Sequence, residues 1–259
     1  LYLNIDAYIY TLIISLFLGF TFLTIKKSDG KISIYIKILT LIAGYLILPL
    51  IISIPYYLSI YNISYLNCFF EAVSGFTSTG FTIFENIKHI DESLILWRSS
   101  SQWIGGIYFL FSIILLIDIF DDNLKKSLTN YISFNSAEIF KQSLKILILY
   151  SILTLFLFIV LKLINIRTFD SFNLSMTIIS SGGFLPFNNI DLIINSDLKK
   201  IVFSILMLFS YFSLFLTYNF FYLRKKSLNF FAEDIYLFIY LIFLIIVFFV
   251  FFNFDYNFS

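Results

Sequence analysis

The chain has 259 residues, of which 60% are hydrophobic, 21% aromatic and 13% charged, and its mean hydropathy is +0.94. This hydrophobic content is far above that of soluble globular domains and indicates a protein that crosses a membrane several times. A net charge of +1 and a single cysteine exclude a basic nucleic-acid surface and a disulfide framework.

Six apolar stretches are long enough to span a bilayer as helices, which takes about 20 residues. They cover residues 8–25, 34–57, 94–118, 144–166, 200–222 and 235–252. Two further segments, residues 62–84 and 169–188, begin apolar and then turn polar and glycine-bearing, which predicts re-entrant loops. We therefore expect an all-α polytopic membrane protein with two re-entrant pore loops.

The distribution of Lys and Arg orients these segments. Eleven of them fall on one side of the expected topology and six on the other. The first side is predicted to be cytoplasmic, because short cytoplasmic loops carry the excess of positive charge. Both re-entrant segments then open to the outside.

The expected segments form an internal repeat. Residues 34–118 and 144–222 each read as helix, short half-helix with a polar loop, and helix, and Gly80 and Gly182 lie 102 positions apart. Duplicated interrupted segments of this kind are typical of a transport site. The expected sections are 1–33, an N-terminal helix and cytoplasmic loop; 34–122 and 123–226, the two pore repeats; and 227–259, the first helix of an incomplete third repeat.

The stretch SGFTSTGFT, residues 74–82, cannot continue a helix. An unpaired backbone carbonyl at membrane depth is costly unless it faces water, protein or an ion. Carbonyls in such a loop can replace the hydration shell of a cation, and Gly80 can adopt backbone angles closed to other residues. The preceding half-helix aims its partially negative C-terminal end at the same point.

The stretch ISSGGF, residues 179–184, repeats this design, and Pro186 stops any onward helix. Neither loop contains Asp or Glu, which favours a monovalent over a divalent cation. Small hydroxyl residues and glycines also occur at tight helix contacts, but two such loops at matching positions favour a filter. The alternative is a secondary transporter of another cation or small solute with broken helices. No catalytic motif is visible, so the chain is not expected to be an enzyme.

Glu71 and Arg98 are both predicted near the outer end of the first repeat. Charges at that depth are expensive unless paired, which predicts a mutual salt bridge; two separately hydrated charges are the alternative. Exchanging the two residues should then restore folding lost in the single mutants.

These motifs resemble a known family. FEAVSGFTSTGFT (residues 70–82), followed by LWRSSSQWIGG (residues 96–106), resembles the first pore repeat of the TrkH/TrkG/KtrB potassium transporters. TIISSGGF (residues 177–184) is similar to the second filter of that family, and FFAEDIYLF (residues 230–238) to the start of its third repeat. Ser181 departs from the threonine that is usual before the second filter glycine.

The resemblance implies K+ uptake across a prokaryotic inner membrane through helix, re-entrant loop and helix units of the K+ channel-like superfamily. It implies four such repeats around one pore and gating by a cytoplasmic nucleotide-binding regulatory subunit of TrkA or KtrA type. It also implies a homodimer in membrane lipid, with no nucleic acid and no cofactor beside the transported K+. The residues that match the family's filter strands, through their backbone, are Thr77, Ser78, Thr79, Gly80, Phe81, Ile179, Ser180, Ser181, Gly182 and Gly183.

The chain carries two of the four repeats that the resemblance implies. We expect a fragment or one side of a split gene. The alternative is a half-length protein that pairs into a dimer to complete four strands, which symmetry allows.

Overall fold

The computed structural model describes residues 4–24, 33–116 and 139–211, together with residues 236, 239–240 and 242–247. The chain divides into two compact units, Leu1–Leu216 and Thr217–Ser259. In the second unit the described residues are helical and their side chains are mostly exposed. The remainder of the expected third repeat, residues 227–259, lies outside the described residues, as do residues 117–118 and 212–222 of two expected spans.

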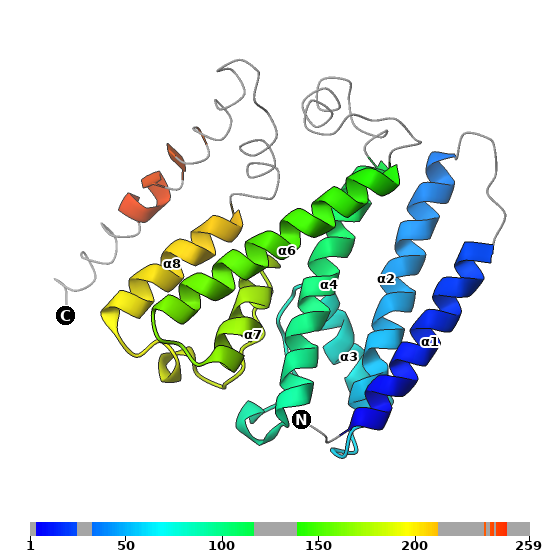
Figure 1. Ribbon diagram of the computed structural model, residues 1–259, viewed down its shortest axis with the longest axis horizontal. Helices are drawn as coiled ribbons and strands as arrows, with labels where there is room; N and C mark the ends of the chain where they lie inside the picture. Colours follow the sequence, from blue (N-terminus) through cyan, green and yellow to red (C-terminus); the bar gives the residue numbers. More distant parts are fainter. Residues whose placement is uncertain are drawn as a thin grey trace. The chain divides into compact units, whose positions relative to one another are not determined.

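Every element described in the first unit is a helix (Figure 1). The elements in chain order are α1 (Ile5–Thr24), α2 (Ile34–Tyr57), α3 (Tyr65–Phe76), η1 (Ile87–His89), α4 (Glu92–Leu116), α6 (Ile139–Leu163), α7 (Thr168–Ile179), η4 (Ile190–Leu192) and α8 (Asp197–Tyr211). The expected all-α fold class is confirmed. The short helices α3 and α7 lie beside the longer helices α2, α4 and α6.

Three described helices are long and apolar enough to cross a membrane, over Ile5–Phe22, Ile34–Tyr57 and Ser143–Leu163. Helix α4 has 25 residues, enough for about 37 Å at the helical rise. It is less apolar because of the run WRSSSQW, whose side chains are turned inward: Arg98 and Gln102 are almost fully buried. A polar run inside a spanning helix is tolerated where it faces protein rather than lipid.

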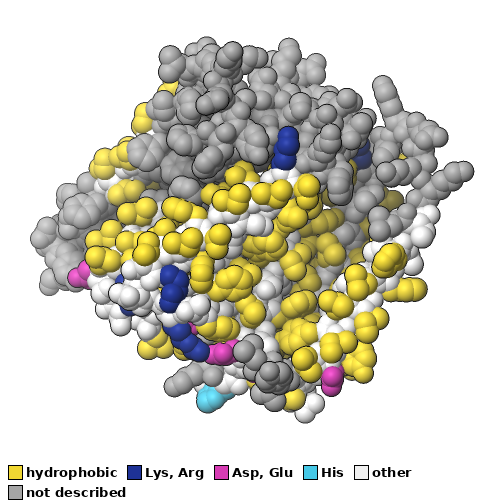
Figure 2. Space-filling model, viewed as in Figure 1, with side chains coloured by type: hydrophobic (Ala, Val, Ile, Leu, Met, Phe, Trp, Pro, Cys, Tyr) yellow, Lys and Arg dark blue, Asp and Glu magenta, His cyan; other side chains and the backbone are white. Residues whose placement is uncertain are grey.

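The outer surfaces of the helices are apolar. Figure 2 shows hydrophobic side chains over most of the visible described face. Large apolar side chains of α1 and α2 are exposed, among them Phe17, Tyr35 and Leu39, at 68%, 83% and 67%. A soluble monomer rarely exposes continuous apolar surface on this scale. These faces suit contact with lipid, and the structure is that of an integral membrane protein.

Helices α3 and α7 have 12 residues each, about 18 Å, which is too short to cross a hydrocarbon core of about 30 Å. Both end in the same way. Ser78 and Ser181 adopt left-handed backbone angles, with φ of 54° and 52°. The next amide donates back into the last turn, from Thr79 to the Ser74 carbonyl at 2.9 Å and from Gly182 to the Thr177 carbonyl at 2.8 Å. This is the Schellman pattern of a helix end, here with serine at the position that glycine usually fills.

The two repeats superimpose in sequence with a constant offset. Helices α3 and α7, the turns η1 and η4, and the positive-φ residues Asn62 and Asn165 all differ by 103 positions. The loop between α3 and η1, residues 77–86, is hereafter the first loop, and residues 180–189, between α7 and η4, form the second loop. Each therefore leaves its short helix with the same backbone path.

Gly105 of α4 permits the closest contact with the end of α3. A Cβ added there would lie 1.9 Å from the carbonyl oxygen of Phe76, whereas one added at Gly19 of α1 would meet nothing within 4 Å. We expect Gly105→Ala to cost about 1–3 kcal/mol or more, since the added atom presses on backbone.

Thermal unfolding in detergent measures this effect. Gly105→Ala should lower Tm clearly, whereas Gly19→Ala should leave Tm equal or slightly higher, because alanine favours a helix over glycine. Equal Tm values for Gly105→Ala and wild type would contradict the close packing.

Candidate functional site

The first and second loops face each other. Gly80 and Gly183 have φ of +81° and +130°, backbone angles that favour glycine. A Cβ added to Gly80 would lie 3.0 Å from the carbonyl oxygen of Gly182 and 3.2 Å from the Cα of Gly183. Two segments about a hundred residues apart thus meet backbone to backbone, without side chains between them.

The structure corrects the register of the repeat. Gly80 corresponds to Gly183 rather than to Gly182, because the constant offset is 103 positions. The counterpart of residues 77–81 is residues 180–184. Ile179 is the last residue of α7 and corresponds to Phe76, and Phe184, which the sequence analysis left out, corresponds to Phe81. The tandem glycines of ISSGGF allowed either register, and only the backbone path distinguishes them.

Each loop is fastened to its own short helix by one hydroxyl. The Oγ of Ser74 donates to the carbonyl of Phe81 at 2.5 Å, and the Oγ1 of Thr177 donates to the carbonyl of Phe184 at 2.9 Å. These two carbonyls therefore point toward their helices. Of the five predicted residues in the first loop, Phe81 is the one whose carbonyl is held by the protein.

The carbonyls that come just before those of Phe81 and Phe184 differ from them in their hydrogen bonding. Within the described part of the chain, no hydrogen bond is donated to the main-chain oxygens of Ser78, Thr79, Gly80, Ser181, Gly182 or Gly183. The predicted residues of both loops thus come together on facing segments and present unengaged main-chain oxygens.

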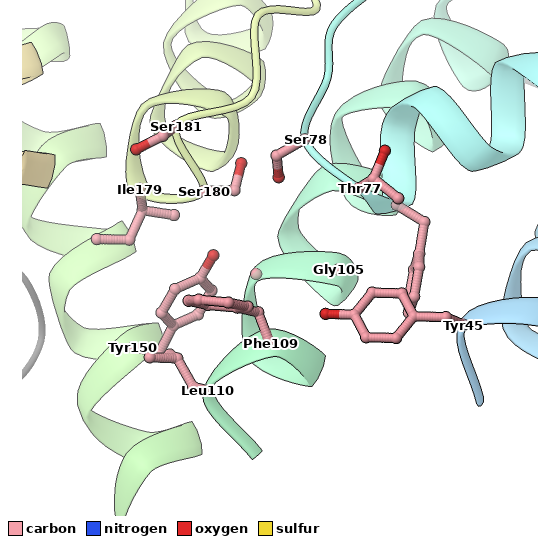
Figure 3. A pocket seen from close by; sticks show the side chains of 12 residues that line it. Tyr45, Thr77, Ser78, Gly105, Phe109, Leu110, Tyr150, Ile179, Ser180 and Ser181 are labelled. Atoms are coloured by element: carbon pink, nitrogen blue, oxygen red, sulfur yellow. The ribbon is translucent and has the colours of Figure 1, made fainter. Parts of the chain in front are cut away.

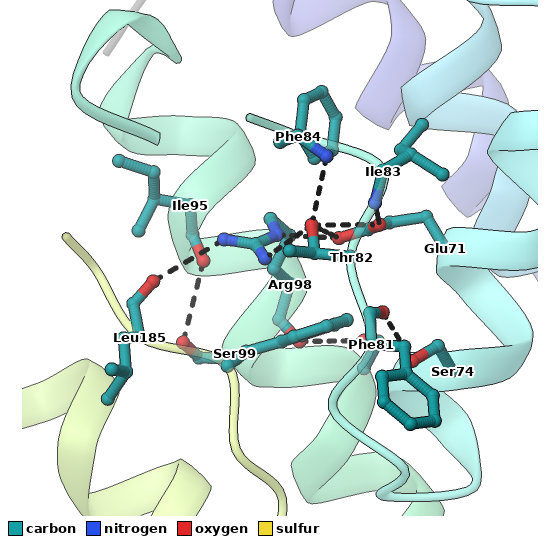
Figure 4. Close-up of polar contacts among 12 residues, drawn as sticks. Glu71, Ser74, Phe81, Thr82, Ile83, Phe84, Ile95, Arg98, Ser99 and Leu185 are labelled. Atoms are coloured by element: carbon teal, nitrogen blue, oxygen red, sulfur yellow. Dashed lines mark hydrogen bonds and ion pairs between the residues drawn. The ribbon is translucent and has the colours of Figure 1, made fainter. Parts of the chain in front are cut away.

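A buried ion pair stands behind the first loop (Figure 4). The Nε of Arg98 lies 2.8 Å from the Oε1 of Glu71, and the two side chains are 1% and 0% exposed. The carboxylate also accepts from the Oγ1 of Thr82 and from the amide of Ile83, at 3.0 and 2.9 Å. The expected salt bridge is therefore present and continues into the backbone of the loop.

The same guanidinium reaches the second loop. Its Nη1 donates to the carbonyl of Leu185 at 3.4 Å and its Nη2 to the Oγ1 of Thr82 at 3.0 Å. Its carbon lies 4.3 Å from the centre of the Phe184 ring and 5.5 Å from that of Phe84, within the range of cation–π attraction. Arg98 thus touches both loops at once.

Gln102, one turn further along α4, supports the second loop. The hydrogen-bond network assigns its amide: the nitrogen donates to the Oγ1 of Thr177 at 3.0 Å, and the oxygen accepts from the amides of Phe184 and Gly183 at 3.1 and 3.3 Å. A Cβ added to Gly182 would collide with this amide at 2.2 Å. Sequence reasoning missed Gln102, although its spacing of four from Arg98 places both on one helix face.

Among the described residues the second repeat has no counterpart of the Glu71–Arg98 pair, for a local reason. Leu174 occupies the position of Glu71, and Pro186 occupies that of Ile83. The amide that Glu71 binds in the first repeat is absent from proline, so an apolar residue suffices in the helix.

A cavity of about 430 Å³ lies where α3 and α7 end (Figure 3). Its wall is apolar and aromatic toward the long helices and carries hydroxyl groups toward the two loops; the lining residues are Tyr45, Phe76, Thr77, Ser78, Gly105, Gly106, Phe109, Leu110, Tyr150, Ile179, Ser180 and Ser181. The buried hydroxyl of Tyr150 has no hydrogen-bond partner in the described ranges. Both short helices direct their partially negative ends at this cavity, which favours a cation there.

The opposite side of the loops is tied together by polar contacts. The side chain of Asn188 accepts from the amide of Ile87 at 2.7 Å and donates to the carbonyl of Glu85 at 2.6 Å. An exposed ion pair joins Arg167 to Glu92. His89 is exposed, and among the described residues no three His, Cys, Asp or Glu side chains are grouped to hold a metal ion.

No family model matches the chain. It is 28% identical over 219 residues to an uncharacterized cation transporter of Methanocaldococcus jannaschii, a match that covers 80% of this chain and 44% of the relative. It is 39% identical over 66 residues, 26% of this chain and 12% of the relative, to the Trk system potassium uptake protein TrkI of Halomonas elongata. The crystal structure of the potassium transporter TrkH from Vibrio parahaemolyticus matches with a TM-score of 0.63 at 19% identity, over 80% of this chain and 42% of that one.

The fold is that of a helical membrane protein, and the relatives that the chain resembles are named as cation and potassium transporters. The chain spans less than half the length of these relatives. Its motifs, its relatives and its fold are similar to those of the TrkH/TrkG potassium transporters.

The buried pair yields a stability prediction. Glu71→Leu leaves the guanidinium of Arg98 buried without its anion, which costs about 3–5 kcal/mol. We expect a markedly lower Tm in detergent. Combining it with Arg98→Ile should recover part of the loss, since no unpaired charge remains. A double variant as unstable as Glu71→Leu would contradict this account.

Exchanging the two residues is expected to fail, contrary to the expectation from sequence. An arginine at position 71 would face the amide of Ile83, and a glutamate at position 98 would face the carbonyl of Leu185. The first contact would bring two hydrogen-bond donors together and the second two acceptors, so neither hydrogen bond could form. The hydrogen bonds around the pair therefore override the simple charge argument.

Proposed function

We propose that the chain forms one side of a K+ pore, in which main-chain oxygens of residues 77–80 and 180–183 replace the water around the ion. The observation that carries this proposal is the pair of facing loops in which the carbonyls of residues 78–80 and 181–183 accept no hydrogen bond from the described protein. At membrane depth such oxygens need a polar partner. A dehydrated cation on a shared axis is such a partner.

Charge and ligand type support a monovalent ion. Neither filter stretch, residues 77–81 or residues 180–184, carries a carboxylate, whereas sites for divalent ions in proteins commonly use several. The partially negative ends of α3 and α7 favour a cation in the cavity next to the loops. The names of the relatives, a cation transporter and potassium uptake proteins, agree with this choice.

The driving force in this proposal is the membrane potential. An inside-negative potential contributes about 2.3 kcal/mol per charge for each 100 mV, which draws K+ from the outer side through the loops into the cavity. The transporter would lie in the prokaryotic inner membrane.

Two loops cannot surround an ion, so the proposal includes further strands. The resemblance implies four in all, supplied by more repeats or by a second copy of the chain. A nucleotide-binding subunit of TrkA or KtrA type is the proposed regulator on the cytoplasmic side.

The test is uptake of Rb+, a K+ substitute, in cells that lack their own potassium systems and express the native gene. Wild type should show saturable uptake that K+ inhibits far better than Na+. Gly80→Ser and Gly183→Ser each place a side chain at positive φ and should lower this preference about tenfold, which is roughly 1.4 kcal/mol of discrimination. The reason is that each added atom moves the carbonyls of both loops.

Gly19→Ser is the matched control, because its added side chain meets open space on α1. It should keep the wild-type preference. Wild-type selectivity in Gly80→Ser and Gly183→Ser, with normal amounts of protein in the membrane, would reject the proposed filter.

A further inference from the structure

We propose that Arg98 and Gln102 of α4 determine ion selectivity as positioning residues, because they fix the two loops relative to each other and aim the carbonyls of the second loop. This inference rests on the proposed function. It concerns two side chains outside the predicted ion-binding backbone.

Arg98 contacts equivalent residues of the two loops. Thr82 and Leu185, which accept from its two terminal nitrogens, differ by 103 positions and are therefore equivalent residues of the two loops. One rigid, planar guanidinium holds the same point of both repeats. At this point the two loops are joined by one side chain, which is anchored on Glu71.

Gln102 orients the peptide planes of the second loop. In a trans peptide the N–H and the preceding C=O point in opposite directions. Gln102 holds the N–H groups of Gly183 and Phe184, so the carbonyls of Gly182 and Gly183 are directed away from α4. The carbonyl oxygen of Gly182 accordingly lies closest to the position of a Cβ on Gly80.

The amides of the equivalent residues Gly80 and Gly183 are held by different groups. In the first loop the carbonyl of Ser74 on α3 accepts from the amide of Thr79 at 2.9 Å, and from that of Gly80 at 3.5 Å. In the second loop the amide of Gly182 likewise donates to the carbonyl of Thr177 at 2.8 Å. The amide of Gly183, however, is held by Gln102 of α4, a helix of the other repeat.

The two supporting long helices, α4 and α8, differ in polarity. Helix α8 begins at Asp197, 105 positions after the start of α4 at Glu92, and the side chains that it buries are the apolar Phe203 and Leu206, 8% and 5% exposed. In the described part of the chain, the long helix that gives both loops polar support is therefore α4.

Three variants test the inference in the native transporter. Arg98→Lys keeps a positive charge for Glu71 but loses the fork that joins Thr82 to Leu185. Gln102→Met has a similar volume but no acceptor, and Gln102→Asn keeps the amide on a side chain too short to reach both N–H groups. The matched control is Arg167→Lys, which alters an exposed ion pair between the repeats.

The readout is the Rb+ over Na+ preference per folded transporter, together with the apparent KM and maximal rate for Rb+ uptake. We expect every variant that reaches the membrane folded to lose about tenfold in preference, with a raised KM, whereas Arg167→Lys stays at wild type. A purely structural role would lower the amount of protein and leave the preference of the remaining molecules unchanged.

Other results would overturn either this inference or the proposed function. A folded variant of Arg98 or Gln102 with wild-type preference overturns the inference, and so does failure of all three variants to fold, since the side chains would then serve folding alone. If wild type itself shows no saturable Rb+ uptake, the proposed function fails first. Selective wild-type uptake with unchanged variants rejects this inference only.

Discussion

The structure depends on one constraint: main-chain oxygens that leave a helix inside a membrane must find a partner. Helices α3 and α7 stop after 12 residues, and left-handed serines turn the chain back on itself. Hydroxyls bind the carbonyls of Phe81 and Phe184, whereas within the described residues no hydrogen bond is donated to those of residues 78–80 and 181–183. In the proposed pore a cation on the axis between the loops resolves this imbalance, and the cavity, the helix ends and the glycines serve the same requirement.

The two repeats reach one geometry by different chemistry. The first uses Glu71 to bind the amide of Ile83, and the charge this introduces is matched by Arg98. The second has Pro186 and Leu174 at the equivalent positions and needs neither charge. Because α4 lies between the loops, its arginine and glutamine serve the second repeat as well, and an apparent duplication becomes one interdependent unit.

The sequence predicted those features that follow from the length and polarity of short stretches. Apolar length predicted the spans over α1, α2 and α6, and the stretch SGFTSTGFT predicted the end of α3. The burial cost of charge predicted the pairing of Glu71 with Arg98. The register of the second loop was wrong by one, because two adjacent glycines are equivalent until the backbone path is known. Gln102 and Asn188 were missed because their partners lie about 75 and 101 positions away, and hydrogen bonds at such separations leave no periodic signal in a sequence.

The most direct test of the central claim is to locate the ion in an experimental structure. A crystal of the native transporter grown in Rb+ gives an anomalous signal that marks each bound ion independently of the protein. We predict Rb+ on the axis between the loops, within contact of main-chain oxygens of Thr79, Gly80, Gly182 and Gly183. Rb+ bound only to side-chain carboxylates elsewhere, or loops whose carbonyls turn away from any shared axis, would contradict the account.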